Sequence, residues 1–412
     1  MRKNNWLAEK IEQYFGPILV LFSLGLLCYL LASSLGAFGT ISDFPEYYAP
    51  AKMCLNGQGG AAYVINLLGQ EQHKIFPMMG ERVVLLFVPP PGLMLAIWLG
   101  LFNPLTAEII WKGLLVACLV GTIVIMAKMF SLKNKATCYL VTAMCLSQAC
   151  YEVLRIDQLA PILLFSLTAA IYFLKKKQDI KAGLFLSLFI LKPQLILVYL
   201  AYLAGMRRWR PLLTMIIVVS VLTVLAYFVI GSVGFKNYFD LLRLPTIAHF
   251  MQPELMPTLR GQLLKILPDD ASVIMKLSII VYGIVVAGAY LLGAKYRQAA
   301  HAIELGILLV MPLGLITALH CHSYDLLLLL PSLLILFNDT AIKFGPYFKL
   351  LVIAGSIVFV LPLSTMIHYD YLLRGGKCNI WFVELLILSA MIFKISMRQK
   401  PNSEVEIVTQ VK

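Results

Sequence analysis

Two carboxylates stand at the start of a long polar stretch, directly after the first apolar run of the chain. Asp43 follows that run, and Glu46 comes three residues later in the segment SDFPEYYAPAKM. A carboxylate held beside an apolar boundary has a raised pKa, which suits a general base that removes a proton from a hydroxyl group. Ser42 and Asp43 also precede a segment of amphipathic character, so Asp43 is alternatively a helix cap. The residues alone leave both roles open.

Basic residues that could bind an anionic group such as a phosphate occur at two places. Lys192 lies inside the apolar stretch FILKPQLIL, where a charge is costly and usually marks a function, although its side chain could instead extend to lipid headgroups. Arg260, in MPTLRGQLLKIL, is either solvated or able to clamp a phosphate. The turn RIDQLAP adds Arg155, Asp157 and Gln158, and an ion pair between Arg155 and Asp157 is its structural alternative.

The segment ITALHCHSYDLLLLLP places His320, His322 and Asp325 at one end of an apolar run. If this part is helical from His322 onward, His322 and Asp325 share a face. The chain has no HExxH motif and no paired-cysteine spacing, so a metal site is not favoured. Histidines that bind a phosphate or position a hydroxyl group are the preferred interpretation, with a structural role as the alternative.

The composition requires that these residues be positioned by membrane-spanning helices. The chain has 412 residues, of which 60% are hydrophobic and only 13% are charged. A soluble domain has about 25% charged residues, so there is too little polar material here to cover a water-soluble globule. The net charge of +13 comes from short basic clusters between apolar runs, which is typical of topology signals. Nucleic acid is therefore not an expected partner.

The apolar runs predict an all-α polytopic membrane protein with about twelve transmembrane helices. They lie near residues 17–37, 106–128, 137–151, 159–174, 181–191, 194–206, 211–231, 272–294, 302–319, 324–337, 347–366 and 379–395. Two of them are short and are separated by a break at Lys192-Pro193, because proline has no amide hydrogen and clashes with the preceding turn.

Residues 83–102 are apolar enough to span, but the triple proline Pro89 to Pro91 predicts a broken, non-spanning element. With this choice the later basic clusters and both termini face the cytoplasm, as the positive-inside rule requires. The expected organisation is one integral membrane domain over residues 1–400 with a short cytoplasmic tail at 401–412. The polar candidates then share the extracytoplasmic face. Its long loops are 38–105, which contains juxtamembrane helices, and 232–271.

Several segments in order resemble the family 87 glycosyltransferases, polytopic enzymes of the GT-C superfamily. The matching segments are DFPEYYAPA, FVPPPGLML, LTAEIIWKGL, DQLAPILLFSLTAAIYFLKKK, KAGLFLSLFILKPQL, RRWR, MPTLRGQLLKIL and HSYDLLLLLP. They cover residues 40 to 337, about three quarters of the chain. Asp157 stands where the family often has glycine, and Val88 stands where it often has tyrosine. These departures leave the sugar and the acceptor open.

The resemblance implies a GT-C fold and inverting transfer of a sugar, such as mannose, from a polyprenyl-phosphate donor. The acceptor hydroxyl would belong to a lipid or glycan at the extracytoplasmic face of the cytoplasmic membrane. Asp43 matches the family's catalytic base, and Lys192, Arg260 and His322 are expected to hold the donor phosphate. Further site candidates are Glu46, Tyr47, Arg155, Gln158, His320 and Asp325. No cofactor is expected, and dependence on a divalent metal stays open. A transporter or flippase of a lipid-linked sugar, using the broken helices as half-helices, is the alternative.

Overall fold

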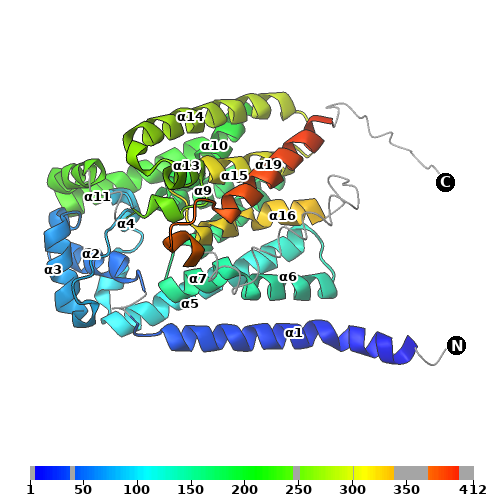
Figure 1. Cartoon of the computed structure of the whole chain (residues 1–412), viewed down its shortest axis with the longest axis horizontal. Helices are drawn as coiled ribbons and strands as arrows, with labels where there is room; N and C mark the ends of the chain where they lie inside the picture. Colours follow the sequence, from blue (N-terminus) through cyan, green and yellow to red (C-terminus); the bar gives the residue numbers. More distant parts are fainter. Residues whose placement is uncertain (1–4, 38–41, 245–250, 300, 338–369, 399–412) are drawn as a thin grey trace.

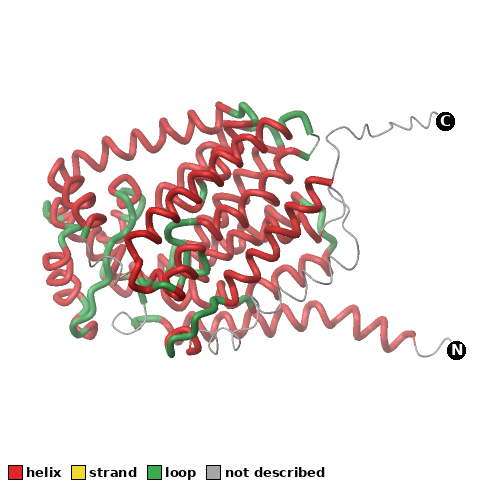
Figure 2. Tube along the Cα trace, turned by 45° about the horizontal axis from the view of Figure 1, so that its top comes forward, coloured by secondary structure: helices red, strands yellow, loops and turns green. Residues whose placement is uncertain are grey.

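The computed structural model describes residues 5–37, 42–244, 251–299, 301–337 and 370–398. All regular structure in these ranges is helical, which confirms the predicted all-α class (Figure 2). The predicted span at 347–366 and the predicted tail at 401–412 lie outside the described residues.

The longest helices are apolar over most of their length. They are α1, α5, α11 and α14, at Asn5–Ser34, Pro104–Met129, Trp209–Arg243 and Ala271–Tyr296. Each contains a window long and apolar enough to cross about 30 Å of hydrocarbon at about 1.5 Å per residue. Their exposed side chains include Phe228 and Leu291, as expected for faces that contact lipid. The chain is therefore a multi-pass membrane protein.

Shorter helices fill the bundle between these long helices. They are α6 (Asn134–Leu146), α7 (Gln148–Ile156), α8 (Ala160–Lys175), α9 (Asp179–Leu186), α10 (Leu197–Gly205), α15 (Ala302–Thr317), α16 (Leu330–Phe337) and α19 (Ile380–Arg398). Helices α8 and α15 are buried along almost their whole length. Their apolar character therefore reflects an interior position, and the predicted total of twelve spans stays a prediction.

Both predicted helix breaks are confirmed. Residues 83–102 contain only the short helix α4 (Pro90–Leu93) and the 3-10 helix η3 (Ile97–Leu101). Lys192 has non-helical backbone angles, φ −146° and ψ 71°, between the 3-10 helices η4 (Ser187–Leu191) and η5 (Pro193–Leu195). In each case proline begins a new short element after the break.

The loop elements gather at one end of the bundle. This end contains α2 (Pro45–Leu55), η1 (Gly59–Ala61), α3 (Ile65–Ile75) and η2 (Pro77–Met79). Figure 1 shows α2, α3 and α4 at one end, whereas α1 begins and α19 ends at the other. The first-loop elements and the start of α1 with the end of α19 thus lie at opposite ends of the bundle, and the side of the membrane that each end faces stays a prediction.

The predicted second long loop, 232–271, is partly helical. Helix α11 bends at Gly231, whose φ of 66° is in the left-handed region, and then continues to Arg243 over η1 and α4. The amide of Asn237 donates to the Gly60 carbonyl at 2.8 Å and fixes this contact. The rest of the described loop contains η6 (Pro253–Leu255), α13 (Leu259–Ile266) and η7 (Pro268–Asp270).

Helices α10 and α14 pack at glycines on both sides of their contact. A Cβ atom at Gly205 would collide with the Tyr290 carbonyl, and one at Gly293 would collide with the Tyr202 carbonyl. We expect Gly293→Val to lower the melting temperature and the folded yield, because overpacking costs about 1–3 kcal/mol or more where backbone cannot move. Gly283→Val is the matched control, since Gly283 is on the same helix with no atom within 4 Å of an added Cβ. Equal melting temperatures for the two variants in a fluorescence melt would contradict this packing.

Candidate active site

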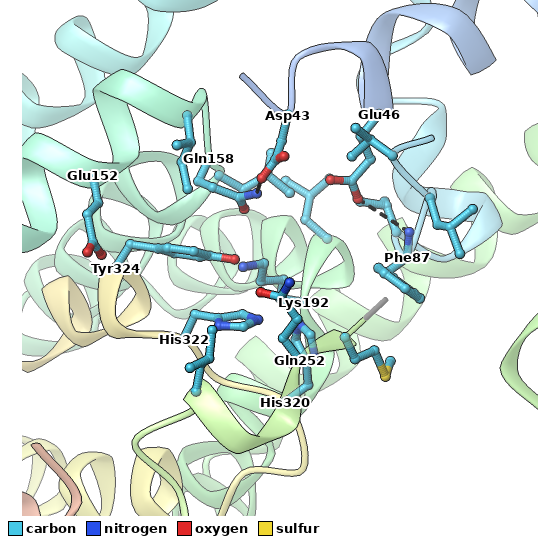
Figure 3. Close-up of a pocket in the computed structure, with 18 of the residues that line it drawn as sticks. Asp43, Glu46, Phe87, Glu152, Gln158, Lys192, Gln252, His320, His322 and Tyr324 are labelled. Atoms are coloured by element: carbon cyan, nitrogen blue, oxygen red, sulfur yellow. Dashed lines mark hydrogen bonds between the residues drawn. The ribbon is translucent and has the colours of Figure 1, made fainter. Parts of the chain in front are cut away.

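A cavity of about 950 Å³ opens at the loop end of the bundle, between the first loop, α7, the break at Lys192 and the segment before η8 (Ser323–Leu329). Its volume is at the upper end of the range for ligand pockets, about 300–1,000 Å³. Its lining includes seven of the site candidates, namely Asp43, Glu46, Arg155, Gln158, Lys192, His320 and His322. The fold thus brings together residues that are up to 279 positions apart, from 43 to 322 (Figure 3).

Asp43 is fixed at the cavity by both its backbone and its carboxylate. Its backbone N–H donates to the Ile156 carbonyl at 3.0 Å. Gln158 Nε2 donates to Oδ2 at 2.8 Å, and Arg82 Nη2 donates to Oδ1 at 2.8 Å. Helix α2 has Phe44 as its N-cap residue and no side-chain cap. The interpretation of Asp43 as a helix cap is therefore wrong.

The two carboxyl groups at the cavity differ in their partners and in their protonation. Burial raises the pKa of Asp43, while the hydrogen bond from Gln158 and the charge of Arg82 oppose that rise. Burial and the charge of Asp43 together raise the pKa of Glu46 to about 8, although Glu46 Oε1 accepts a 3.3 Å bond from the Phe87 N–H. At neutral pH, Asp43 is the better candidate for an ionised base, and Glu46 is mostly protonated.

The turn that holds Asp43 is itself anchored by a buried ion pair. Asp157, at φ 63°, ends α7, and its Oδ2 accepts a 2.7 Å bond from Ser42 Oγ. Its Oδ1 lies 2.6 Å from Lys112 Nζ, and both side chains are at most 4% exposed. The predicted pairing of Asp157 with Arg155 is wrong, because Asp157 pairs with Lys112 and the Arg155 guanidinium lies 5.8 Å from the centre of the Tyr151 ring.

The same lysine connects this turn to the chain on the other side of the undescribed residues 38–41. Lys112 Nζ lies 3.6 Å from Glu108 Oε1, and Glu108 Oε2 accepts a 2.8 Å bond from the Gly36 N–H. Buried charges are costly unless they are paired, so this network is expected to hold its members in one arrangement. The network holds the chain at Gly36, before residues 38–41, and at Ser42, after them. Ser42 directly precedes Asp43.

Lys192 is paired within the protein and does not extend to headgroups. Its Nζ lies 2.9 Å and 3.2 Å from the two oxygens of Asp325, and its side chain is 11% exposed. The ammonium group is also 4.7 Å from the centre of the Tyr324 ring, which lines the cavity. Lys192 therefore presents a positive charge at the cavity wall, as Figure 3 shows.

His322 and Asp325 are related as the two ends of a capping box. Asp325 Oδ2 accepts from the His322 N–H at 3.0 Å, and the His322 side chain accepts from the backbone at Asp325. Because η8 begins only at Ser323, the two residues meet through this cap and not on one helix face. The cap places the His322 ring at the cavity and the Asp325 carboxylate behind it, next to Lys192.

The two histidines are neutral and adjacent. Burial lowers the pKa of His322 to about 4 and holds that of His320 well below its usual value. Their ring centroids are 4.9 Å apart, and His322 stacks on Tyr324 at 5.3 Å. A neutral imidazole has one N–H donor and one acceptor nitrogen, so these rings can bind hydroxyl groups or phosphate oxygens. In the described part of the chain, no three His, Cys, Asp or Glu side chains group to hold a metal ion.

Three sequence candidates do not line the cavity. Arg260 is buried on α13, where its Nη1 donates to the Leu319 carbonyl at 2.9 Å, directly before His320. Tyr47 packs on Trp111 with ring centroids 5.2 Å apart. Asp325 is the third. Direct binding of phosphate by Arg260 stays a prediction. In the structure, its hydrogen bond to the Leu319 carbonyl supports the backbone that leads into His320.

Sequence reasoning missed Arg82, Lys112, Glu152 and Tyr324. Arg82 lies in a long loop with no pattern to distinguish it. Lys112 did have a signal, because Glu108 and Lys112 are four residues apart inside the apolar run of α5, where charged residues are rare and usually paired.

Fold and cavity together define a multi-pass helical membrane protein with a partly buried carboxylate, Asp43, and a paired cation, Lys192, at the loop end of its bundle. The family model for Glycosyltransferase family 87 matches residues 87–316, which is more than half of the chain. The protein belongs to this family and to the sugar-transferring class of enzymes. No curated protein and no solved structure matches the chain significantly. The matched range includes Gln158 and Lys192, whereas Asp43 lies before it.

Proposed function

We propose that the protein transfers a hexose such as mannose from a polyprenyl-phosphate donor to an acceptor hydroxyl, with inversion at the anomeric carbon. The observation that carries the proposal is the fixed Asp43 carboxylate, held by Gln158 and Arg82 in the same cavity as the Lys192 ammonium. In Figure 3, Lys192 lies between Asp43 on one side and His320 and His322 on the other. A base and a cation in one cavity suit a displacement in which a hydroxyl group loses a proton and a phosphate gains charge.

The proposed step is a single displacement. The acceptor oxygen attacks the anomeric carbon and forms the new glycosidic bond, while the bond from that carbon to the phosphate oxygen breaks. Asp43 takes the hydroxyl proton, and the bonding electron pair leaves with polyprenyl phosphate. Positioned general-base catalysis is worth roughly 10²–10⁴ in rate.

The leaving phosphate gains negative charge as the bond breaks, so cations near it stabilise the transition state. Lys192 supplies such a charge, and its partner Asp325 keeps the ammonium group in place before the donor binds. His320 Nδ1 has no hydrogen-bond partner among the described residues and can donate a further bond from a neutral imidazole, whereas His322 adds one only by exchanging its hydrogen bond to the Met251 backbone. An apolar wall for the first part of the lipid chain is formed by Val83, Val84, Leu85, Phe87, Val88, Pro89, Leu191 and Pro193.

We place the cavity on the extracytoplasmic side of the cytoplasmic membrane, with both termini in the cytoplasm. Supporting this orientation, the cavity is lined by the first loop, whose helices α2, α3 and α4 lie at the end away from the start of α1 and the end of α19 (Figure 1). At the end of the bundle away from the cavity, basic residues between the helices form ion pairs. Lys175 pairs with Glu304 at 2.7 Å, and Arg208 pairs with Asp179 at 3.6 Å.

The donor assignment is tested in proteoliposomes supplied with a radiolabelled hexose on either polyprenyl phosphate or a nucleoside diphosphate. We expect the label to leave polyprenyl phosphate only, and a β-linked donor to give an α-linked product. Consumption of the nucleotide sugar alone, or a product that retains the donor's configuration, would contradict the proposal.

A pH prediction concerns Glu46. Because its pKa is raised to about 8, Glu46 is protonated at neutral pH and becomes charged as the pH rises through that value. A second negative charge beside Asp43 and the leaving phosphate should then slow transfer, so activity should fall on the alkaline side. Glu46→Gln should remove this decline, whereas Glu81→Gln, at an exposed edge of the same cavity, should keep it. Turnover measured from about pH 6 to about pH 9.5 decides the point, and an unchanged alkaline decline in Glu46→Gln counts against it.

A further inference from the structure

Helix α7 presents a polar stripe to the cavity that the proposed step does not use. Four of its cavity-lining residues are polar or aromatic, namely Gln148, Tyr151, Glu152 and Arg155, at positions i, i+3, i+4 and i+7 on one helix face, and Ile156 at the helix end also lines the cavity. The other face is apolar and buried, with Cys150, Val153 and Leu154.

The centre of the stripe is held in place by hydrogen bonds. Glu152 Oε1 accepts from Gln148 Nε2 at 2.9 Å, and Glu152 Oε2 accepts from Ser323 Oγ at 2.6 Å. Gln148 Oε1 is buried and has no hydrogen-bond donor among the described residues. Such an orphaned acceptor is expected to have a partner that is absent from the protein alone. Figure 3 shows Glu152 beside Tyr324, away from Glu46 and Phe87.

The chemistry of the stripe excludes parts of the donor and favours a polyol. A carboxylate repels a phosphate, so the donor phosphate belongs on the Lys192 side of the cavity. A polyprenyl chain would leave the buried Gln148 Oε1 without a partner, at a cost of about 1–3 kcal/mol. Neighbouring sugar hydroxyl groups both donate and accept, so they match a carboxylate next to an amide, and the Tyr151 ring offers an apolar surface to the sugar carbons.

We propose that this face of α7 binds the acceptor, and that the acceptor is a carbohydrate whose neighbouring hydroxyl groups contact Gln148 and Glu152. This inference rests on the proposed transferase function and names its second substrate by class. Gln158 lies two residues after the end of α7 and donates a hydrogen bond to Asp43, so an acceptor along α7 points toward the base.

The test compares Gln148→Leu and Glu152→Gln with two control variants in proteoliposomes. Gln178→Leu and Asp240→Asn are the controls, because both residues are exposed and do not line the cavity. The donor is polyprenyl phosphate carrying a labelled hexose. The acceptors are octyl glucoside, octyl mannoside and octyl galactoside, with a palmitoylated serine peptide as the non-carbohydrate alternative. Hydrolysis of the donor by water is measured separately.

We expect the α7 variants to raise the KM for at least one glycoside roughly tenfold and to leave donor KM and donor hydrolysis within about twofold. Unchanged glycoside KM in both variants, a rise confined to donor KM, or transfer to the peptide at the rate of the best glycoside would overturn the inference.

In nanodiscs without donor, saturation-transfer NMR with methyl glucoside, methyl mannoside and methyl galactoside gives an independent readout. Binding of one of them that is lost in Gln148→Leu supports the subsite. No binding by the wild type overturns it. If the wild-type protein bound a glycoside but neither hydrolysed nor transferred the hexose of polyprenyl phosphate, the result would count against the proposed function and not against the α7 subsite.

Discussion

Asp43→Asn should lower the turnover number roughly 10²–10⁴-fold, because an amide cannot take the proton of the acceptor hydroxyl. Asparagine has nearly the same shape and can still bond to Gln158 or Arg82, so the fold should persist. The donor KM should change little, since Lys192 and the histidines hold the phosphate in the proposed step. Initial rates in proteoliposomes over a range of donor concentrations measure both quantities.

Asp240→Asn is the matched control for this substitution, because Asp240 is half exposed on α11 and pairs only with Lys236 among the described residues, at 3.8 Å. It should keep wild-type turnover. If Asp43→Asn retained more than about a tenth of wild-type turnover, Asp43 would not be the base.

Lys112→Met should have the largest effect on stability. It removes the cation shared by Asp157 and Glu108 and leaves buried carboxylates without their partner, which costs about 3–5 kcal/mol in comparable buried pairs. We expect a lower melting temperature and a lower folded yield. We also expect reduced turnover in the protein that does fold, because the turn that holds Asp43 loses its anchor.

A second substitution distinguishes lost charge pairing from simple loss of packing. Lys112→Met with Asp157→Asn removes the unpaired charge at the turn, while asparagine can still accept the bond from Ser42. The double variant should recover much of the melting temperature lost in Lys112→Met. Lys236→Met, at an exposed ion pair, should leave the melting temperature unchanged. A double variant that melts below Lys112→Met would show that the pair does not act as proposed.

Local patterns predicted the parts of the fold that depend on local physics. Apolar runs identified the long helices, and prolines identified the breaks at Lys192-Pro193 and within residues 83–102. The number of spans was harder to predict, because α8 and α15 are as apolar as α5 but are buried by neighbouring helices. An apolar run has the same composition whether lipid or protein surrounds it.

For the site, the sequence predicted most of the residues with unusual surroundings but not which of them pair with one another. Asp43, Glu46, Gln158 and Lys192 line the cavity as expected. Their partners Arg82 and Asp325 are 39 and 133 positions away in the chain, and such pairs leave no periodic pattern. The Arg155–Asp157 pairing was wrong for the same reason. The two residues are close in the sequence, but Asp157 pairs with Lys112, which is 45 positions away.

The central claim is that one cavity holds the base, the donor phosphate and the sugar. The most direct measurement is a structure of the Asp43→Asn protein with a polyprenyl-phosphate hexose bound. We predict that a phosphate oxygen lies within hydrogen-bond reach of Lys192 Nζ and that the anomeric carbon faces residue 43. A donor bound outside this cavity, or one whose phosphate has no contact with Lys192, would contradict the account.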